Sequence, residues 1–334
     1  MKDFVPHRAL RNSHLMTIAA RLWRRRFPFL PSGKLRLFET EPGTSVRATC
    51  HWHKNPRLHR TIVLLHGLEG SSDSGYVMGT AEKGWLAGFN VVRLNQRNCG
   101  GGDDLTPTLY HSGLSRDIRA VVLELIQKDR LTDVFATGFS MGGNLVLKMA
   151  GEFAAETPPE IKGFVAVAPA LDLAACADAL AEPRNFIYQR HFVRRLKARI
   201  RKKALLFPER YKLNGLHKIR TVREYDDALT APHSGFRDAS DYYARSSGNQ
   251  FLGKIARPTL ILAAQDDPFV PFSSIAKAVQ SVNPLIDLVA TRYGGHCAFI
   301  SSSREERFWS EARIVEFCER VAKGESCDIQ HTSI

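Results

Sequence analysis

Residues 133–154 read DVFATGFSMGGNLVLKMAGEFA: an apolar run, a glycine-rich turn and a second apolar run. The first run predicts a buried strand over 133–140, and the second predicts a buried helix over 141–154. The joint, GFSMG at 138–142, is a G-x-S-x-G motif. In this context it predicts a nucleophile elbow, in which Ser140 projects from a strained turn and the glycines remove side chains that would collide. The alternative is a glycine-rich helix start without chemistry.

Apolar runs and amphipathic stretches alternate on both sides of this motif. Further strands are expected at RTIVLLHGL (60–68), NVVRLN (90–95), IKGFVAVAP (161–169), PTLILAAQ (258–265) and LIDLVAT (285–291). Helices are expected at 76–87, 114–128 and 305–322. This alternation predicts an α/β fold with a mostly parallel, doubly wound sheet that is covered by helices on both faces.

The segment 170–255 interrupts the alternation and predicts a helical cap or lid with an adjoining crossover. The sheet domain is then expected in two parts, 59–169 and 256–325. Residues 1–58 are interpreted as an N-terminal arm with edge strands, the clearest being RATCHWH at 47–53. Residues 326–334 are predicted to be a disordered tail.

A serine nucleophile needs a base and an acid that orients the base. His296 follows two glycines just after the last predicted strand, so its imidazole is expected to reach back to Ser140. Asp266 and Asp267 end the strand before it. Asp267 is favoured because Pro271 follows it in a D-x-x-x-P spacing, and Asp266 is the alternative. The order Ser140, Asp267, His296 is that of one class of serine hydrolase, in which the elbow comes first.

The turn His66-Gly67-Leu68-Glu69-Gly70 follows an early strand. The backbone N–H groups of Leu68 and Met141 are expected to form an oxyanion hole. His66 is expected to fix this turn by hydrogen bonds. The residues expected to border a substrate pocket are His66, Gly67, Glu69, Cys99 and Phe139.

Composition limits the partners and the compartment. The six cysteines are widely spaced and form no C-x-x-C motif, which favours a cytoplasmic protein. No metal-ligand constellation and no cofactor motif is present, and no secretory signal or membrane span is expected. Residues 183–223 contain fourteen Lys or Arg and one acid, Glu209, so they alone account for the net charge of +13.

This basic segment offers three interpretations. A nucleic-acid partner is unlikely, since no nucleic-acid motif accompanies the charge. The stripe Phe192, Leu196, Ile200 and Leu205 beside the charges is typical of an interfacial helix, which favours peripheral contact with an anionic membrane. The alternative is that the stripe packs on the hydrolase body while the charges stay solvated.

Several motifs together carry a family resemblance. They are LLHGLEGSSDSGYV (64–77), NQRNCGG (95–101), LYHSG (109–113), GFSMGGN (138–144), REYDDALTAPHSGF (223–236), DYY (241–243), AQDDPFVP (264–271) and GGH (294–296). The chain resembles the YheT-like branch of the α/β-hydrolases (AB-hydrolase family four) over about residues 8–322. The resemblance implies an α/β-hydrolase fold and a cytosolic serine carboxylesterase with Ser140, Asp267 and His296 as its triad.

The sequence therefore predicts a serine hydrolase that cleaves short- to medium-chain acyl esters through an acyl-serine intermediate. A small-molecule ester is the expected partner, with neither metal nor cofactor. Two alternatives stay open: an acyltransferase that uses an alcohol as acceptor, and a non-catalytic ligand-binding protein on the same fold.

Overall fold

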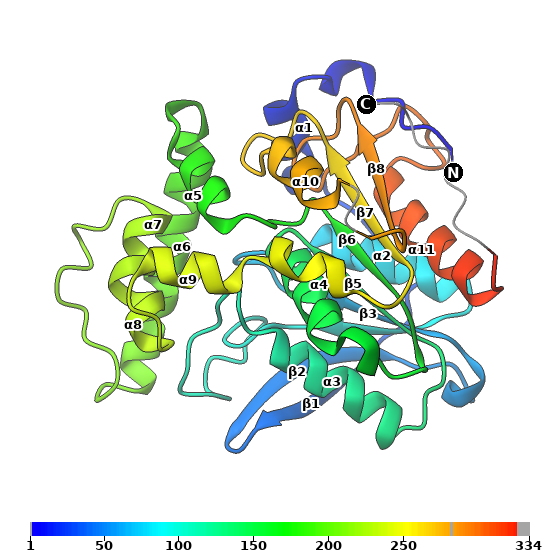
Figure 1. Ribbon diagram of the computed structural model, residues 1–334, viewed down its shortest axis with the longest axis horizontal. Helices are drawn as coiled ribbons and strands as arrows, with labels where there is room; N and C mark the ends of the chain where they lie inside the picture. Colours follow the sequence, from blue (N-terminus) through cyan, green and yellow to red (C-terminus); the bar gives the residue numbers. More distant parts are fainter. Residues whose placement is uncertain (1, 281–282, 326–334) are drawn as a thin grey trace.

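A twisted β-sheet runs through the centre of the molecule (Figure 1). The computed structural model describes residues 2–280 and 283–325. Within this part of the chain the sheet has eight strands in the order β1-β2-β4-β3-β5-β6-β7-β8. The strands are β1 (Lys34–Glu41), β2 (Thr44–His51), β3 (Thr61–Leu65), β4 (Asn90–Leu94), β5 (Val134–Phe139), β6 (Ile161–Val167), β7 (Thr259–Ala264) and β8 (Ile286–Thr291).

The strand register brings distant turns together at one edge of the sheet. β2 is antiparallel to both of its neighbours, and β3 to β8 are mutually parallel. Leu65 of β3 lies opposite Gly138 of β5, so the turn after β3 begins beside the turn after β5. Ala264 of β7 lies opposite Thr291 of β8, which aligns the next two turns in the same way. Ligands of open α/β sheets bind beyond these carboxyl ends.

Helices cover both faces of the sheet (Figure 1). The α-helices are α1 (Ser13–Leu22), α2 (Gly75–Leu86), α3 (Ser115–Gln127), α4 (Met141–Phe153), α5 (Leu173–Ala181), α6 (Phe186–Leu206), α7 (Val222–Tyr225), α8 (Ala231–His233), α9 (Ala239–Ser246), α10 (Phe272–Val279) and α11 (Trp309–Ala322). Short 3-10 turns are η1 (Arg8–Leu10), η2 (Pro56–Leu58), η3 (Ala154–Glu156), η4 (Pro183–Asn185) and η6 (Gly248–Lys254), and η5 (Asp226–Thr230) is a π-helix.

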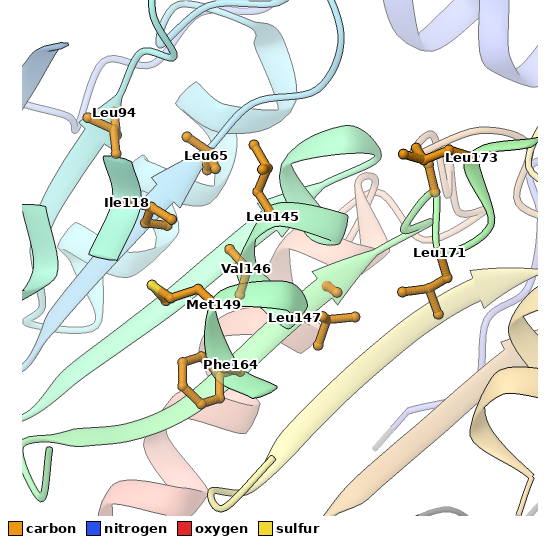
Figure 2. Packing of buried hydrophobic residues seen from close by; sticks show 14 of the residues in the cluster. Leu65, Leu94, Ile118, Leu145, Val146, Leu147, Met149, Phe164, Leu171 and Leu173 are labelled. Carbon is orange, nitrogen blue, oxygen red and sulfur yellow. The ribbon is translucent and has the colours of Figure 1, made fainter. Parts of the chain in front are cut away.

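Side chains of each central strand alternate between two cores, as the pleat of a strand requires. Val63 and Leu65 of β3 join the core that includes α3 and α4, whereas Ile62 and Leu64 join the core that includes α2 and α11. Figure 2 shows Leu145, Val146 and Met149 of α4 in the first core, with Phe164 of β6. In α4 only Glu152 is exposed, so this apolar helix packs on nearly every side.

The segment 170–255 contains α5 to α9 and the turns between them. In Figure 1, α5 to α9 gather beside the sheet, on its left. The longest described helix, α6, has 21 residues and holds eight of the fourteen Lys and Arg residues of the basic segment 183–223. No helix in the described ranges has both the length and the apolar character required to cross a bilayer.

The fold class predicted from the sequence is confirmed, and each predicted strand and helix is present. Boundaries differ by a few residues. The run at 60–68 forms a strand only as far as Leu65, because its last residues make the turn toward the elbow. The final helix begins at Trp309 rather than at 305. The predicted tail, 326–334, lies outside the described residues.

Candidate active site

Ser140 lies between the end of β5 and the start of α4 in a strained backbone conformation. Its φ is 54° and its ψ is −119°, a region that non-glycine residues rarely adopt. The flanking glycines are required by close approach: a Cβ on Gly138 would lie 2.1 Å from the carbonyl oxygen of Gly142, and a Cβ on Gly142 would lie 2.5 Å from that of His66. The elbow therefore has the local geometry that the motif predicts.

Asp267 and His296 form a direct pair at the ends of β7 and β8. Asp267 Oδ2 lies 2.8 Å from His296 Nδ1. The other carboxylate oxygen, Oδ1, accepts the amide N–H groups of Phe269 and Val270 at 3.1 and 2.9 Å. These bonds hold the carboxylate in place and direct one oxygen at the imidazole.

The charge of Asp267 acts on the imidazole. Burial by itself lowers the pKa of His296, but the Asp267 carboxylate and the Cys297 sulfur outweigh burial, so this pKa is raised above its usual value. A raised pKa means that the protonated ring is stabilised. That is the state a histidine reaches when it takes a proton from a serine hydroxyl.

Asp266, the alternative acid, points elsewhere. Its Oδ1 accepts the amide N–H of Gly295 at 2.9 Å. Its Oδ2 is buried without a hydrogen-bond partner in the described structure, and burial raises the pKa of this carboxyl. Asp266 thus shapes the loop that carries His296, whereas Asp267 contacts the ring.

Two neighbours of His296 were not predicted from the sequence. Thr17 of α1 accepts the backbone N–H of His296 through its hydroxyl oxygen at 2.9 Å, across 279 positions of the chain. The Cys297 sulfur lies 3.8 Å from His296 Nε2 and 3.6 Å from the carbonyl oxygen of Val167. No local pattern marks Thr17, whose contact arises only when remote turns meet. Cys297 follows His296 directly, but its bond to Val167 is also a contact between distant turns.

The carbonyl of Val167 joins the two halves of the site. It accepts the backbone N–H of Ser140 at 2.8 Å and the Cys297 thiol at 3.6 Å. No hydrogen bond connects Ser140 Oγ with His296 Nε2, although both side chains are described. Such bonds in ligand-free sites often form only when substrate binds.

Backbone amides surround the serine. A Cβ on Gly67 would lie 3.0 Å from the Ser140 Cβ, so the turn after β3 packs directly on the elbow. The amides of Gly67 and Glu69 are occupied by the hydroxyls of Tyr76 and Tyr110. Within the described structure, those of Leu68 and Met141 have no such partner and are available to an oxyanion.

A cavity with about 850 Å³ of empty space, including its opening, lies between Ser140 and the helices of segment 170–255. Ser140, Met141 and Leu68 belong to its wall. Much of the remaining wall is apolar and comes from α5, α6 and the turn after β7: Leu173, Cys176, Ala177, Leu180, Phe192, Leu196, Phe269 and Val270. A polar wall comes from residues 111–112 and 225–243.

The prediction that His66, Gly67, Glu69, Cys99 and Phe139 border the pocket is wrong. None of these five residues lines the cavity. Phe139 packs in the core on the α2 side of the sheet. His66 holds the turn after β3, because its ring forms hydrogen bonds with the carbonyl oxygen of Gly67 and the amide N–H of Gln96. Burial lowers the pKa of His66 to about 4. Cys99 packs behind Tyr110. The carboxylate of Glu69 faces away and is bound by arginine.

Several basic side chains of α6 bind the turns after β3 and β4, and we call these contacts the clamp. Arg199 binds both oxygens of Glu69, at 2.7 and 3.0 Å. Lys203 is fully buried and donates to the carbonyls of Asp103 and Thr106, and Lys202 pairs with Asp103 at 2.6 Å. These contacts attach α6 to the turns beside the elbow, with Lys203 buried, Arg199 largely buried and Lys202 more than half exposed.

The apolar stripe on α6 follows the alternative interpretation given above, in which it packs on the hydrolase body. Leu196 and Ile200 are buried and Phe192 lines the cavity, so the stripe faces the hydrolase body and not a membrane. Leu205 is the exception and is 84% exposed.

Comparisons with known proteins agree with this architecture. Residues 60–303 match the model of the family described as alpha/beta hydrolase fold. A candidate esterase, YheT of Escherichia coli (strain K12), is 33% identical over 97% of this chain and 95% of its own. Phospholipase ABHD3 of Mus musculus is 31% identical over 79% of this chain, which spans only 62% of that longer protein.

A solved structure shows the same fold at greater distance. The crystal structure of the 2,6-dihydroxy-pseudo-oxynicotine hydrolase superposes with a TM-score of 0.60, covering 93% of this chain and 73% of the other. Its sequence identity is 18%, so this likeness bears on the fold alone. From the family match, the YheT identity and the sheet order together, the chain belongs to the α/β-hydrolase fold family, in its YheT-like branch.

Proposed function

We propose that this chain is a carboxylic ester hydrolase that works through an acyl-Ser140 intermediate. The observation that carries the proposal is the strained Ser140 at the wall of a largely apolar cavity. The Asp267–His296 pair supports it, because the Val167 carbonyl contacts both the Ser140 amide and Cys297, the neighbour of His296. Relatives named as a candidate esterase and a phospholipase support ester substrates.

In the proposed reaction, Ser140 Oγ attacks the ester carbonyl carbon and its proton passes to His296 Nε2. The amides of Leu68 and Met141 bind the oxyanion, each typically worth roughly 3 kcal/mol of transition-state stabilisation. The alcohol leaves with the proton from His296. Water then attacks the acyl carbon and gives a proton to His296. His296 passes this proton to Ser140 Oγ as the carboxylic acid leaves. Asp267 keeps the ring in the required tautomer.

The apolar wall supports a short- to medium-chain acyl group, because such a chain loses its contact with water there. A p-nitrophenyl ester series from acetate to palmitate measures this preference. An alcohol acceptor in place of water would make the protein an acyltransferase, and product analysis with added alcohol distinguishes the two.

The test is Ser140→Ala, with the exposed Ser302→Ala as a matched control. Ester turnover should fall by at least about 10³-fold in Ser140→Ala and stay unchanged in the control. A fluorophosphonate probe should label only proteins that retain Ser140, which mass spectrometry can localise. If the folded wild-type protein is neither labelled nor active, it is a ligand-binding protein and the proposal is wrong.

We also propose peripheral contact with an anionic membrane, now at the first turn of α6. Phe186 and Ile187 are 61% and 67% exposed, beside the exposed Arg184 and Arg190. Apolar side chains flanked by arginine fit a lipid interface. Phe186→Ser/Ile187→Ser should weaken binding to vesicles containing phosphatidylserine and leave turnover of a soluble ester unchanged. Vesicle binding that is absent, or equal in both proteins, contradicts the proposal.

A further inference from the structure

The polar wall of the cavity contains a buried carboxylate that the proposed reaction does not use. Asp226 begins the π-helix η5 within REYDDALTAPHSGF, one of the stretches that carry the family resemblance. It is only 9% exposed and lines the same cavity as Ser140. Single π-turns are rare and frequently mark functional sites.

The hydrogen bonds of Asp226 come from neutral groups. Its Oδ1 accepts the hydroxyl of Thr230 at 2.7 Å, and its Oδ2 accepts the hydroxyl of Tyr243 at 2.7 Å. Both bonds favour the charged carboxylate. Burial raises its pKa only to about 6, so the group is an anion at neutral pH.

No described cation forms an ion pair with this anion: no Lys, Arg or His within residues 2–280 and 283–325 is paired with Asp226. The charge of Arg223 nevertheless lowers the pKa of Asp226 from a distance. Arg223 is itself paired with Asp178 at 2.6 Å and lies over the Tyr243 ring, so it does not contact the carboxylate of Asp226 as an ion pair. Arg199 also lines the cavity, but it is bound by Glu69. A buried charge without a counter-ion is costly unless a ligand supplies one.

Three tyrosine rings lie in the same cavity wall as the carboxylate. Tyr225, Tyr242 and Tyr243 line the cavity with it, and the last two rings lie 5.1 Å apart. His111, also on this wall, does not compete as a cation, because burial lowers its pKa to about 3. Tyrosine rings attract cations through their π faces. A carboxylate and three tyrosines in one wall therefore suit a positively charged nitrogen.

We propose that Asp226 and its tyrosines form a subsite for an ammonium group in the alcohol portion of the ester substrate. The inference rests on the proposed esterase function, and it names the substrate class. The apolar wall from α5 and α6 takes the acyl chain, which leaves the polar wall for the alcohol. Asp226 is then a specificity residue and takes no part in bond breaking.

The experiment compares butyrylcholine with 3,3-dimethylbutyl butyrate, its uncharged isostere, in three proteins. Wild type should prefer the charged ester in kcat/KM by at least about tenfold, which corresponds to one strong contact. Asp226→Asn should lose that preference, so that the ratio of kcat/KM between the charged and the uncharged ester approaches one. The exposed Asp227→Asn, next in the chain, should behave as wild type. Equal rates on both esters in wild type, or a preference that survives Asp226→Asn, would overturn the subsite.

A binding measurement separates this inference from the proposed reaction. Tetramethylammonium should bind Ser140→Ala, measured by calorimetry, and binding should be lost in Ser140→Ala/Asp226→Asn, with tert-butanol as the uncharged control. This result holds even if no ester is cleaved. If Asp226→Asn does not fold, competitive inhibition of wild type by tetramethylammonium, but not by tert-butanol, supports the subsite, and its absence refutes it.

Discussion

Backbone strain is concentrated at the candidate active site. Among the described residues, eight non-glycine positions have a positive φ, and Glu69, Ser140 and Cys297 are three of them. Each such conformation costs on the order of 1–3 kcal/mol and persists only where the surroundings impose it. At Ser140 the glycines of the elbow and the bond to Val167 provide that support. The serine is thus positioned by its backbone before any substrate binds.

The two adjacent acids should differ sharply in their effect on turnover. Asp267→Asn keeps the size of the side chain and removes the charge that stabilises the protonated His296, so kcat should fall on the order of 10⁴-fold. Asp266→Asn alters only the loop around Gly295 and should change kcat a few-fold. Steady-state kinetics on one p-nitrophenyl ester measures both. The opposite order of effects would show that the acid of the triad is Asp266.

Sequence spacing could reach these acids but not their supports. The D-x-x-x-P spacing favoured Asp267, and in the structure that residue contacts His296. Thr17 and Cys297 could not be predicted, because their contacts depend on turns from α1, β6 and β8 meeting in space. The five pocket residues failed for a different reason: a place at or near the carboxyl end of a strand does not say to which face a side chain points.

At the scale of elements, α6 carries basic side chains of two kinds: some are exposed to solvent and some pair with acids on neighbouring turns. Its sequence predicts a charged helix with an apolar stripe, and both features are present. What the sequence could not show is that acids on remote turns, Glu69 and Asp103, pair with its Arg199 and Lys202. The helix is therefore held over the cavity by charge as well as by apolar contact.

Breaking one half of this clamp should cost more than removing both halves. In the native protein, burial would raise the pKa of Glu69, but Arg199 and the hydroxyl of Tyr110 lower it. Arg199→Met leaves that carboxylate buried without its cation, and unfolding free energy should fall by about 3–5 kcal/mol. Glu69→Gln/Arg199→Met should recover a large part of this loss. Urea denaturation measures both.

Arg195 provides the control for the clamp. It lies 3.6 Å from Glu69 with its side chain 48% exposed, so Arg195→Met should cost no more than about 1 kcal/mol. If Arg195→Met and Arg199→Met destabilise the protein equally, the bidentate pair does not hold α6 in place.

At the scale of the whole molecule, the sheet was the most predictable part. Its central strands are buried on both faces, so their sequences are continuous apolar runs such as TIVLL and TLILAA, which periodicity identifies. The helices between them follow because parallel neighbours need crossovers. The arrangement of α5 to α9 was not predictable beyond their helical character, since it depends on packing and ion pairs between distant segments.

Buried histidines should make the whole fold sensitive to mild acid. Burial lowers the pKa of His51 and His66 to about 4 and of His111 to about 3. Below pH 6.5 the unfolded chain binds these three protons first, so stability present at neutral pH is lost as pH falls. Asp226 acts in the opposite direction, because its pKa is raised to about 6. Between pH 6 and 5, His296 is largely protonated in both the native and the unfolded chain, so its raised pKa contributes little to this change.

The net excess is about two protons, which corresponds to on the order of 2–3 kcal/mol per pH unit between pH 6 and 5. Urea denaturation at pH 5.0, 6.0 and 7.5 measures the slope. A free energy of unfolding that is constant over this range would mean that the three histidines are protonated in the native protein.

The bond between Thr17 and His296 also fixes when activity is acquired during synthesis. The two residues are 279 positions apart, so at about 5–20 residues per second the ribosome makes the second roughly 15–60 seconds after the first. In that interval Met16 of α1 lacks its buried neighbours Ala298 and Ile300, and its apolar face has no partner from that loop. Helix α1 is thus made long before the loop on which it packs. The loop that carries His296 therefore takes its support from a helix made 279 positions earlier.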